Sequence, residues 1–134
     1  MVVKMLKKKL GVETIERNWL LSKTTSIETY FKIPSTLIIP EGCVKIGDRV
    51  FQGCEELSKI EIPESVKKIG EGAFEWCKKL GEVIIPESVE VIGTLAFAYC
   101  DNAVIILKKH TEDFKFIGNC AFYYTKDVKE KTRN

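Results

Sequence analysis

The stretch that decides the fold is EIPESVKKIGEGAFEWCKKL, residues 61–80. Its proline, glycine, phenylalanine and cysteine all return at one fixed interval along the chain. Proline occurs at 40, 63 and 86, glycine at 47, 70 and 93, phenylalanine at 51, 74 and 97, and cysteine at 54, 77 and 100. All four series advance by the same step. A constant period of roughly 20–50 residues is typical of a solenoid, in which each repeat stacks on the one before it.

Each repeat is predicted to begin with a short strand and to end with a helical or 3₁₀ turn. Apolar residues alternate in front of each proline, as at Ile60 and Ile62. Proline then ends the strand, because it has no N–H to donate. A second apolar pair, such as Val66 and Ile69, leads to a glycine at which the chain can bend. The motif Ala-Phe-x-x-Cys would turn the chain back, with Phe and Cys facing the core.

The repeats are predicted to occupy residues 34–125, about four in number, with the last one degenerate. Gly118 matches Gly93 at a step longer than the regular one, so two extra residues are expected after Leu107. Lys108 would then take the last inward-facing strand position of this repeat. Divergent terminal repeats are expected where a solenoid is capped.

The two ends of the chain do not follow the repeat. Residues 1–33 are predicted to form an N-terminal cap, because a solenoid must cover the apolar surface of its open end. The spacing of apolar residues favours a helix over about 12–22 and a strand over about 27–33. The helix could instead be an amphipathic segment that binds a partner. Residues 126–134 form a charged tail that is expected to fray.

Composition places the chain among ordinary soluble proteins. A length of 134 residues fits one domain, and 45% hydrophobic with 30% charged residues argues against disorder. The net charge of +2 is too small to indicate a nucleic acid or an anionic membrane as partner. No apolar run approaches the roughly 18 residues of a membrane span, and the start shows no secretory signal. We therefore expect a cytoplasmic protein, or a cell-surface or extracellular one if an upstream leader has been removed.

The repeat unit resembles that of a known family. Its pattern is Leu-x-x-Ile-x-Ile-Pro-x-x-Val-x-x-Ile-Gly-x-x-Ala-Phe-x-x-Cys-x-x-Leu, carried in full by residues 57–80 and nearly so by residues 80–103. This pattern is similar to the BspA-type leucine-rich repeat. The resemblance implies an α/β-type repeat solenoid, a short curved stack of parallel β-strands with turns and short helical segments opposite.

The resemblance also carries expectations about function. Members of the family are mostly surface or secreted proteins of bacteria and protists that are implicated in adhesion or host binding, and none of their repeat positions is catalytic. This chain is shorter than such members and shows no export signal. Gly42, Ser65 and Ser88 occupy the place of the asparagine found in the commoner leucine-rich repeat.

Stacking turns equivalent residues into rows on the surface, because neighbouring strands lie only about 4.8 Å apart. Half of the residues predicted to face outward from the strands are aliphatic, which is typical of an interaction site. This strand face would bind a protein partner or a second copy of the chain, unless the N-terminal segment or the tail covers it. Its predicted binding residues are Ile38, Lys59, Glu61, Glu82, Ile84, Ile105 and Leu107.

A second predicted binding surface is a column of aromatic residues, two positions beyond each repeated phenylalanine. It contains Trp76, Tyr99 and Tyr124, with Gly53 at the same place in the first repeat. Aromatic residues are common at binding hot spots. The alternative is that these rings only pack the edge of the turn.

No catalytic, metal-binding or cofactor-binding residues are predicted. The one histidine, His110, and Asp113 could be combined with a cysteine, but no positioned nucleophile, glycine-rich phosphate loop or carboxylate pair supports a reaction. Cys54, Cys77 and Cys100 are expected to be thiols packed in the core, with a disulfide between neighbouring repeats as the alternative.

The leading hypothesis is therefore a non-enzymatic protein-binding module with a rigid surface, such as an inhibitor or effector of a macromolecular partner. A fragment of a surface adhesin is the first alternative. The second is weak nucleic-acid binding through lysine pairs, against which the interleaved glutamates argue. The pairs concerned are Lys67–Lys68, Lys78–Lys79 and Lys108–Lys109.

Overall fold

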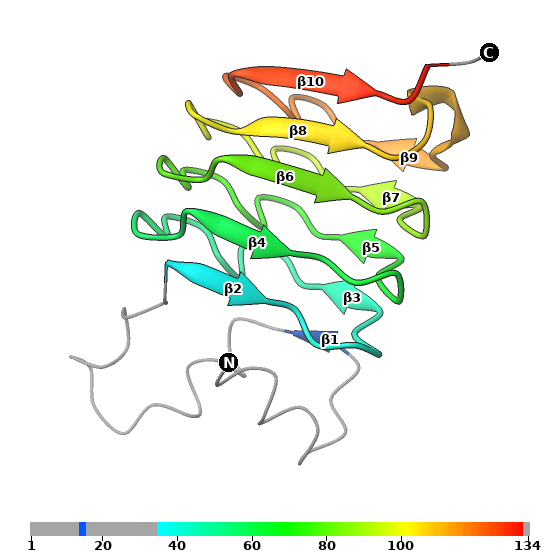
Figure 1. The fold of residues 1–134 in the computed structure, drawn as a ribbon, viewed down its shortest axis with the longest axis horizontal. Coiled ribbons are helices and arrows are strands. Elements are labelled where there is room, and N and C mark those ends of the chain that lie inside the picture. The colour runs from blue at the N-terminus through cyan, green and yellow to red at the C-terminus, as the bar shows by residue number, and fades with distance from the viewer. Residues whose placement is uncertain (1–13, 16–34, 133–134) are drawn as a thin grey trace.

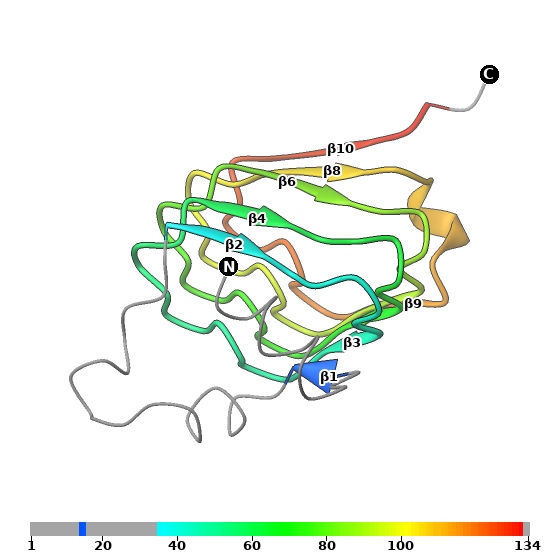
Figure 2. The same ribbon diagram turned by 60° about the horizontal axis from the view of Figure 1, so that its bottom comes forward.

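In the computed structural model, which describes residues 14–15 and 35–132, the chain winds into a stack of rungs. Each rung has three sides: a strand of one parallel sheet, a strand of a second parallel sheet, and a run of turns that leads back to the first sheet (Figure 1). Figure 2 shows the same rungs from a tilted viewpoint, with the first sheet on one side of the stack. The predicted solenoid of parallel strands is confirmed, with strands on two of its sides.

The first sheet contains the strand that precedes each proline. Side chains point alternately into and away from the core, as in β6, where Val83 and Ile85 are buried and Glu82 and Ile84 are exposed. β2 pairs with β4, β6 with β8, and β8 with β10, all in parallel, while β4 and β6 are neighbours without strand pairing, so the first sheet consists of a two-stranded and a three-stranded part. The strands are β2 (Thr36–Ile38), β4 (Lys59–Glu61), β6 (Glu82–Ile85), β8 (Val104–Leu107) and β10 (Asp127–Glu130).

The second sheet consists of two-residue strands, which from β3 onward end just before the repeated glycine. All five strands pair with their neighbours in parallel. The strands are β1 (Thr14–Ile15), β3 (Lys45–Ile46), β5 (Lys68–Ile69), β7 (Val91–Ile92) and β9 (Phe116–Ile117).

The third side of the rungs consists of turns and not of the helical segments that the sequence predicts. Backbone N–H groups in the Ala-Phe-x-x-Cys motif reach the next rung: Phe74 N–H donates to Ala96 O at 2.7 Å, and Trp76 N–H donates to Ala98 O at 2.9 Å. These bonds use donors that a helix would need for its own ladder. Within the described residues the one helical segment is the 3₁₀ turn η1 (Thr111–Asp113), in the insertion between β8 and β9.

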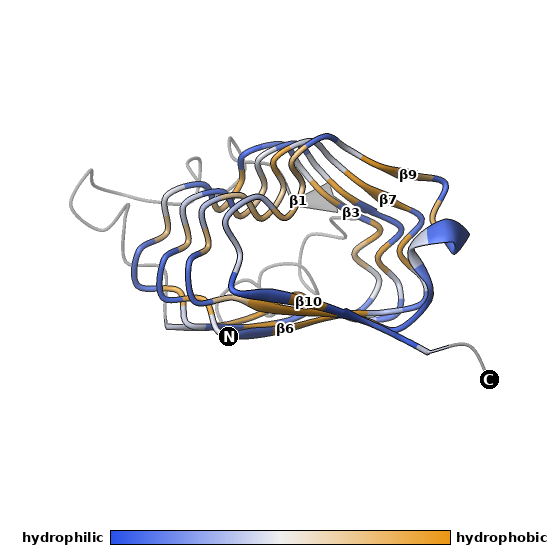
Figure 3. Ribbon diagram, turned by 90° about the horizontal axis from the view of Figure 1, so that it is seen from above, coloured by the Kyte–Doolittle hydropathy of each residue, from blue (hydrophilic) through white to orange (hydrophobic). Residues whose placement is uncertain are grey.

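The core repeats with the rungs. Phe51, Phe74, Phe97 and Phe122 stack ring on ring, with centroid separations of 5.3, 5.1 and 6.1 Å. The first three rings are almost completely buried, among aliphatic side chains of both sheets. Burying such a side chain contributes roughly 1.5–3 kcal/mol to the free energy of unfolding. Viewed down the stack, the rungs lie over one another around this core (Figure 3).

The repeated glycine is required because successive rungs touch at this point. A Cβ built on Gly93 would lie 2.5 Å from the backbone nitrogen of Glu71, and one built on Gly70 would lie 2.7 Å from the backbone nitrogen of Asp48. Both separations are far inside van der Waals contact. The glycine therefore permits a close approach of backbones, in addition to the bend that the sequence predicts.

At the N-terminal end, the predicted cap is tested at two residues only. Residues 14 and 15 form β1, which pairs in parallel with Lys45 and Ile46 of β3. The helix predicted over residues 12–22 is therefore wrong at these two positions, because the backbone there extends the second sheet. The rest of that helix and the strand predicted over residues 27–33 lie outside the described residues.

At the C-terminal end, part of the charged tail is ordered as a strand. β10 pairs with β8 along its whole length, and Glu130 Oε2 accepts a hydrogen bond from Thr111 N–H at 2.8 Å. The expectation that this part of the tail frays is wrong, because β10 continues the backbone ladder of the first sheet. The domain boundaries after residues 33 and 125 stay predictions.

The first-sheet strand of the fourth repeat is displaced by one residue from the predicted register. Glu82 of β6 lies beside Val104 of β8, and Ile85 lies beside Leu107, so the step along the chain is one residue shorter here than in the preceding repeat. The assignment of Lys108 to the last inward position is therefore wrong. Lys108 follows the strand directly, at the place that proline takes in the preceding repeat.

Candidate functional site

The aromatic column predicted from the sequence forms a continuous stack. Trp76 lies on Tyr99 with ring centroids 4.1 Å apart, and Tyr99 lies on Tyr124 at 5.7 Å. Tyr123 meets Tyr124 edge to face at 4.5 Å. Three of the four side chains are strongly exposed: Trp76 to 42%, Tyr123 to 46% and Tyr124 to 63%. These four residues are termed the aromatic edge.

The backbone of the aromatic edge has an unusual conformation. The φ angle is 65° at Trp76, 60° at Tyr99 and 55° at Tyr124, against 72° at Gly53 in the rung of β2 and β3. Residues with a Cβ rarely adopt this left-handed region. Residues in this conformation also take part in the backbone hydrogen bonds between rungs: Tyr99 N–H donates to Tyr123 O at 2.7 Å. The rings therefore occupy positions at which glycine would be less strained.

Polar groups border the aromatic edge. Lys78 Nζ lies 5.4 Å from the centroid of the Trp76 ring and 3.7 Å from Asp101 Oδ2. A side-chain hydrogen bond with Tyr124 raises the pKa of the Tyr123 phenol. The edge thus combines apolar ring surface with hydroxyl groups and a cation, a mixture that suits binding to a protein surface.

The strand face is only partly as predicted. Ile84 is exposed, but Ile105 and Leu107 are buried core residues, and their assignment to the strand face is wrong. The one-residue displacement of β8 turns both of them inward. The outward positions are Val104 and Ile106, and Ile106 lies directly beside Ile84 in the parallel register.

The remainder of the strand face is polar. Lys59, Glu61 and Glu82 are exposed as predicted, and Lys59 Nζ lies 3.7 Å from Glu61 Oε1. Ile38 is half-buried and lies beside Glu61. Apart from Ile38, the apolar part of the face therefore lies around Ile84.

Sequence reasoning missed Val104 and Ile106 because residues 104–107 read Val-Ile-Ile-Leu. A run that is apolar at every position gives no alternation from which to read its inward phase. The buried Ala103 does not supply the phase either, because it stands one regular repeat after the buried Leu80 and the missing residue falls behind it: Val83 follows Leu80 by three positions, whereas Ile105 follows Ala103 by two.

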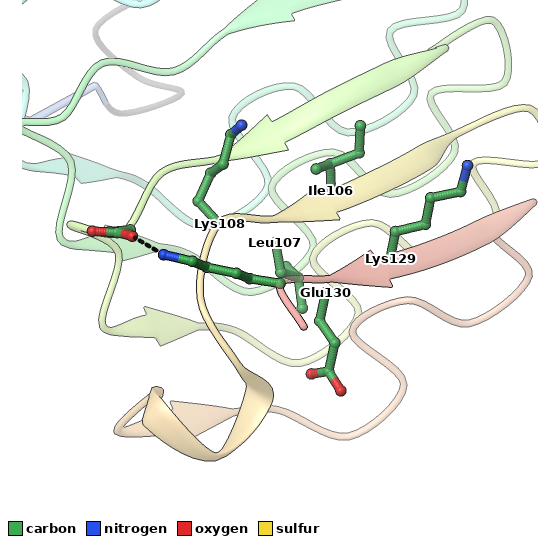
Figure 4. Close-up of a pocket in the computed structure, with 7 residues that line it drawn as sticks. Ile106, Leu107, Lys108, Lys129 and Glu130 are labelled. Carbon is green, nitrogen blue, oxygen red and sulfur yellow. Dashed lines mark hydrogen bonds and ion pairs between the residues drawn. The ribbon is translucent and has the colours of Figure 1, made fainter. Parts of the chain in front are cut away.

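An open pocket extends the strand face at its C-terminal end. Figure 4 shows Ile106, Lys108 and Lys129 on one side of β8 and β10, with Leu107 and Glu130 turned to the other side. On one side, the pocket is bordered by an ion pair between Lys131 Nζ and Glu87 Oε1, which lie 3.5 Å apart. The pocket is lined by Glu87, Ile106, Leu107, Lys108, Lys129, Glu130 and Lys131.

Comparison with known protein families agrees with this architecture. The family described as the BspA type leucine rich repeat region matches residues 25–132, in six copies. The chain belongs to this BspA-type family. No curated protein and no solved structure matches the chain. Membership of the BspA-type family points to protein–protein interaction or to an adhesin-like role.

In this BspA-type solenoid, the lysine pairs lie on different sides of the rungs. Lys68 belongs to the second sheet, Lys108 follows the first sheet, and Lys78 and Lys79 lie in the turns. Lys78 and Lys79 also form ion pairs with acidic residues of neighbouring rungs, at 3.7 and 3.1 Å. The pairs therefore do not make the single basic stripe that nucleic-acid binding would need.

The cysteines of the BspA-type repeat form a ladder in the core. Cys77 Sγ donates to Phe51 O at 3.1 Å, and Cys100 Sγ donates to Phe74 O at 3.0 Å. Hydrogen bonds with Cys100 and Cys54, together with burial, raise the pKa of the Cys77 thiol. All five cysteines of the chain are described, and none is in a disulfide. A thiol with a raised pKa is a poor nucleophile at neutral pH.

His110 lies in the insertion between β8 and β9, beside two carboxylates. Its ring nitrogens lie 3.9 Å from Glu112 Oε1 and 3.4 Å from Glu130 Oε1. Residues 14–15 and 35–132 contain no group of three or more His, Cys, Asp or Glu suited to a metal ion. None of the helical structure in the same residues is long and apolar enough to cross a membrane.

Proposed function

We propose that the chain is a non-enzymatic scaffold that binds a protein partner through its aromatic edge. The observation that supports this most directly is the exposed stack of Trp76, Tyr99 and Tyr124 on left-handed backbone positions. Strained conformations persist where the surrounding structure imposes them, and they cluster at functional sites. A positive φ also occurs at Arg49, Leu95 and Cys120 of the same turns, so it is the exposed stacking of the rings that distinguishes these three positions.

The physical properties of the aromatic edge suit protein recognition. Tyrosine and tryptophan dominate binding hot spots, because each presents a large apolar area together with a polar tip. The stack fixes the rings before any partner arrives, so little side-chain entropy is lost on binding. An inhibitor or effector that holds a macromolecular partner would need such a rigid display.

The strand face is the second candidate surface. Ile84 and Ile106 form an apolar pair on neighbouring strands, and Ile84 is exposed to 44%. A patch of this kind favours contact with a second copy of the chain or with a partner. The polar residues Lys59, Glu61 and Glu82 limit this apolar patch on the same face.

A photo-crosslinking experiment tests the proposal. The residue p-benzoylphenylalanine replaces Tyr124 in one variant and Phe116 in a matched control, because Phe116 is also an exposed aromatic residue but lies in β9 on the second sheet. Both variants are irradiated in an extract of the native cell. We expect a discrete protein adduct from position 124, weaker or absent from position 116, and suppressed by excess unlabelled wild-type chain.

Two further variants assign the adduct to a surface. Trp76→Asn removes a ring from the edge without backbone strain, because asparagine tolerates the left-handed conformation, and it should reduce the adduct. Ile84→Glu should leave the adduct unchanged. Loss of the adduct in Ile84→Glu with no effect of Trp76→Asn would place the interface on the strand face. Equal adducts from positions 124 and 116 would contradict a specific edge.

A further inference from the structure

The aromatic column lacks a ring in the first rung that the structure describes completely, the one that contains β2 and β3. Gly53 takes the place that Trp76 takes one rung later, with φ of 72° against 65°. Gly53 N–H donates to Glu75 O at 2.8 Å, so the two rungs are in direct backbone contact here. A Cβ built on Gly53 would have no described atom within 4 Å. Among residues 14–15 and 35–132, a place for one side chain therefore stays empty next to Trp76 in the column.

One face of the Trp76 ring borders this empty place. The other face packs on Tyr99 at 4.1 Å, and Tyr99 is the only described ring that stacks on Trp76. Lys78 Nζ lies over the ring at 5.4 Å from its centroid, and it also pairs with Asp101 of the following rung at 3.7 Å. Trp76 remains 42% exposed, and no described ring stacks on its face toward Gly53.

The first rung carries an acidic residue where the second rung carries a basic one. Lys78 stands two residues beyond Trp76, and Glu55 stands two residues beyond Gly53. Glu55 is exposed and makes no ion pair with any residue that the structure describes, whereas Glu56 is paired with a lysine of the next rung. By the repeat, Glu55 thus holds the position relative to the empty place that Lys78 holds relative to Trp76.

We propose that an arginine side chain of the protein partner fills this place. Its guanidinium group is planar and would stack on the open face of Trp76, while its N–H groups would reach the carboxylate of Glu55. A lysine ammonium is compact and strongly hydrated, so it would pair with Glu55 but stack less well. A neutral aromatic ring would stack but leave Glu55 unused. The inference rests on the proposed function and names what the partner contributes to the aromatic edge.

Titration with short peptides tests this inference on the full chain. The variant Trp19→Phe leaves Trp76 as the one indole, since the sequence has two tryptophans, and its fluorescence reports on the ring. The probe is acetyl-Gly-Arg-Gly-amide, and the matched peptides contain lysine, phenylalanine or the uncharged arginine analogue citrulline. We expect a saturable change with the arginine peptide, and a dissociation constant at least about threefold lower than for the other three.

Two substitutions separate the stack from the ion pair. Gly53→Tyr fills the empty place with a ring, as Tyr99 and Tyr124 do at the same left-handed position, and should abolish the response. Glu55→Gln keeps the space and should weaken arginine binding to the level of citrulline. Circular dichroism checks that both variants fold, and Glu55→Gln still decides the matter if Gly53→Tyr does not. Arginine binding that is unchanged in the folded variants, or matched by the phenylalanine peptide, would overturn the inference.

This test and the crosslinking test can fail separately. If position 124 crosslinks to a partner and the arginine peptide does not bind, the aromatic edge stands as the interface and the arginine inference is overturned. If the arginine peptide binds as expected and position 124 gives no specific adduct, the empty place next to Trp76 stands as an arginine site and the proposed function fails.

Discussion

Trp76 lies flat on Tyr99 of the following rung, with ring centroids 4.1 Å apart and 9° between the ring planes. Both residues have a positive φ, 65° and 60°, so the stack stands on two backbone positions that disfavour side chains with a Cβ. Stacking and backbone strain have opposite effects on the stability of the fold. Substitutions at Trp76 can separate the two effects.

We expect Trp76→Gly to be more stable than Trp76→Ala by about 1 kcal/mol, because alanine keeps the strained conformation and glycine relaxes it. Both variants lose the stack with Tyr99, so their difference isolates the backbone term. Urea unfolding followed by circular dichroism gives the two free energies of unfolding. At Lys79, an exposed turn residue without a positive φ, glycine should instead be no better than alanine. The same order of glycine and alanine at both positions would contradict the strain at Trp76.

The close approach of successive rungs gives a second prediction. Gly93→Ala should lower the free energy of unfolding by at least about 2 kcal/mol, because its Cβ would lie 2.5 Å from the backbone nitrogen of Glu71 and the rungs would have to separate. Gly81→Ala is the matched control, since its Cβ would meet only Ser58 O at an ordinary 3.7 Å. Gly81→Ala should change stability by less than about 1 kcal/mol. Thermal unfolding of both variants measures the contrast, and equal losses would refute the argument.

The fold could be predicted because the same physical requirements recur in every rung. A phenylalanine that must stack, such as Phe74, and a glycine that must admit a neighbouring backbone, such as Gly70, return at the same interval. The turns in place of helices were not predictable from this interval. They depend on N–H groups bonding to the next rung, as Phe74 N–H does to Ala96 O, and such partners do not appear in a local pattern.

The stacked aromatic residues of the candidate site could be predicted because they occupy one position of the repeat in successive rungs. Trp76, Tyr99 and Tyr124 share such a position, and they are stacked in the structure. Ile105 and Leu107 were assigned to the wrong face because the step along the chain from β6 to β8 is one residue shorter than the regular step. Since side chains alternate along a strand, a displacement of one residue exchanges the buried and exposed sets completely.

That displacement gives a third prediction. Ile105→Ala should lower the free energy of unfolding by about 2–5 kcal/mol, because Ile105 is fully buried and its removal leaves a cavity. Ile106→Ala, at the neighbouring half-buried outward position, should lower it by less than about 1 kcal/mol. Denaturant unfolding of the two single variants provides the comparison. A larger loss for Ile106→Ala would restore the register predicted from the sequence.

The cysteine ladder gives a fourth prediction, on thiol reactivity. Hydrogen bonds with Cys100 and Cys54 and burial hold the pKa of Cys77 above its usual value. The reactive thiolate is therefore scarcer at pH 8 than for an ordinary cysteine. Cys120 is exposed. At pH 8, Ellman's reagent should therefore modify Cys120 at least about a thousandfold faster than Cys77. Access to Cys77 requires an opening whose free energy approaches that of unfolding, about 5 kcal/mol or more.

Single substitutions assign the kinetic phases of this reaction. Cys120→Ser should remove the fast phase and leave the slow phase intact, whereas Cys77→Ser should keep the fast phase and reduce the slow amplitude. Serine retains a donor for Phe51 O, which accepts the Cys77 Sγ hydrogen bond at 3.1 Å, so the core should stay closed in that variant. Adding urea should merge the two phases as the rungs open. Rapid labelling of Cys77 in the native chain would mean that the turns open independently of the sheets, and the rigid display on which the proposed function depends would then be lost.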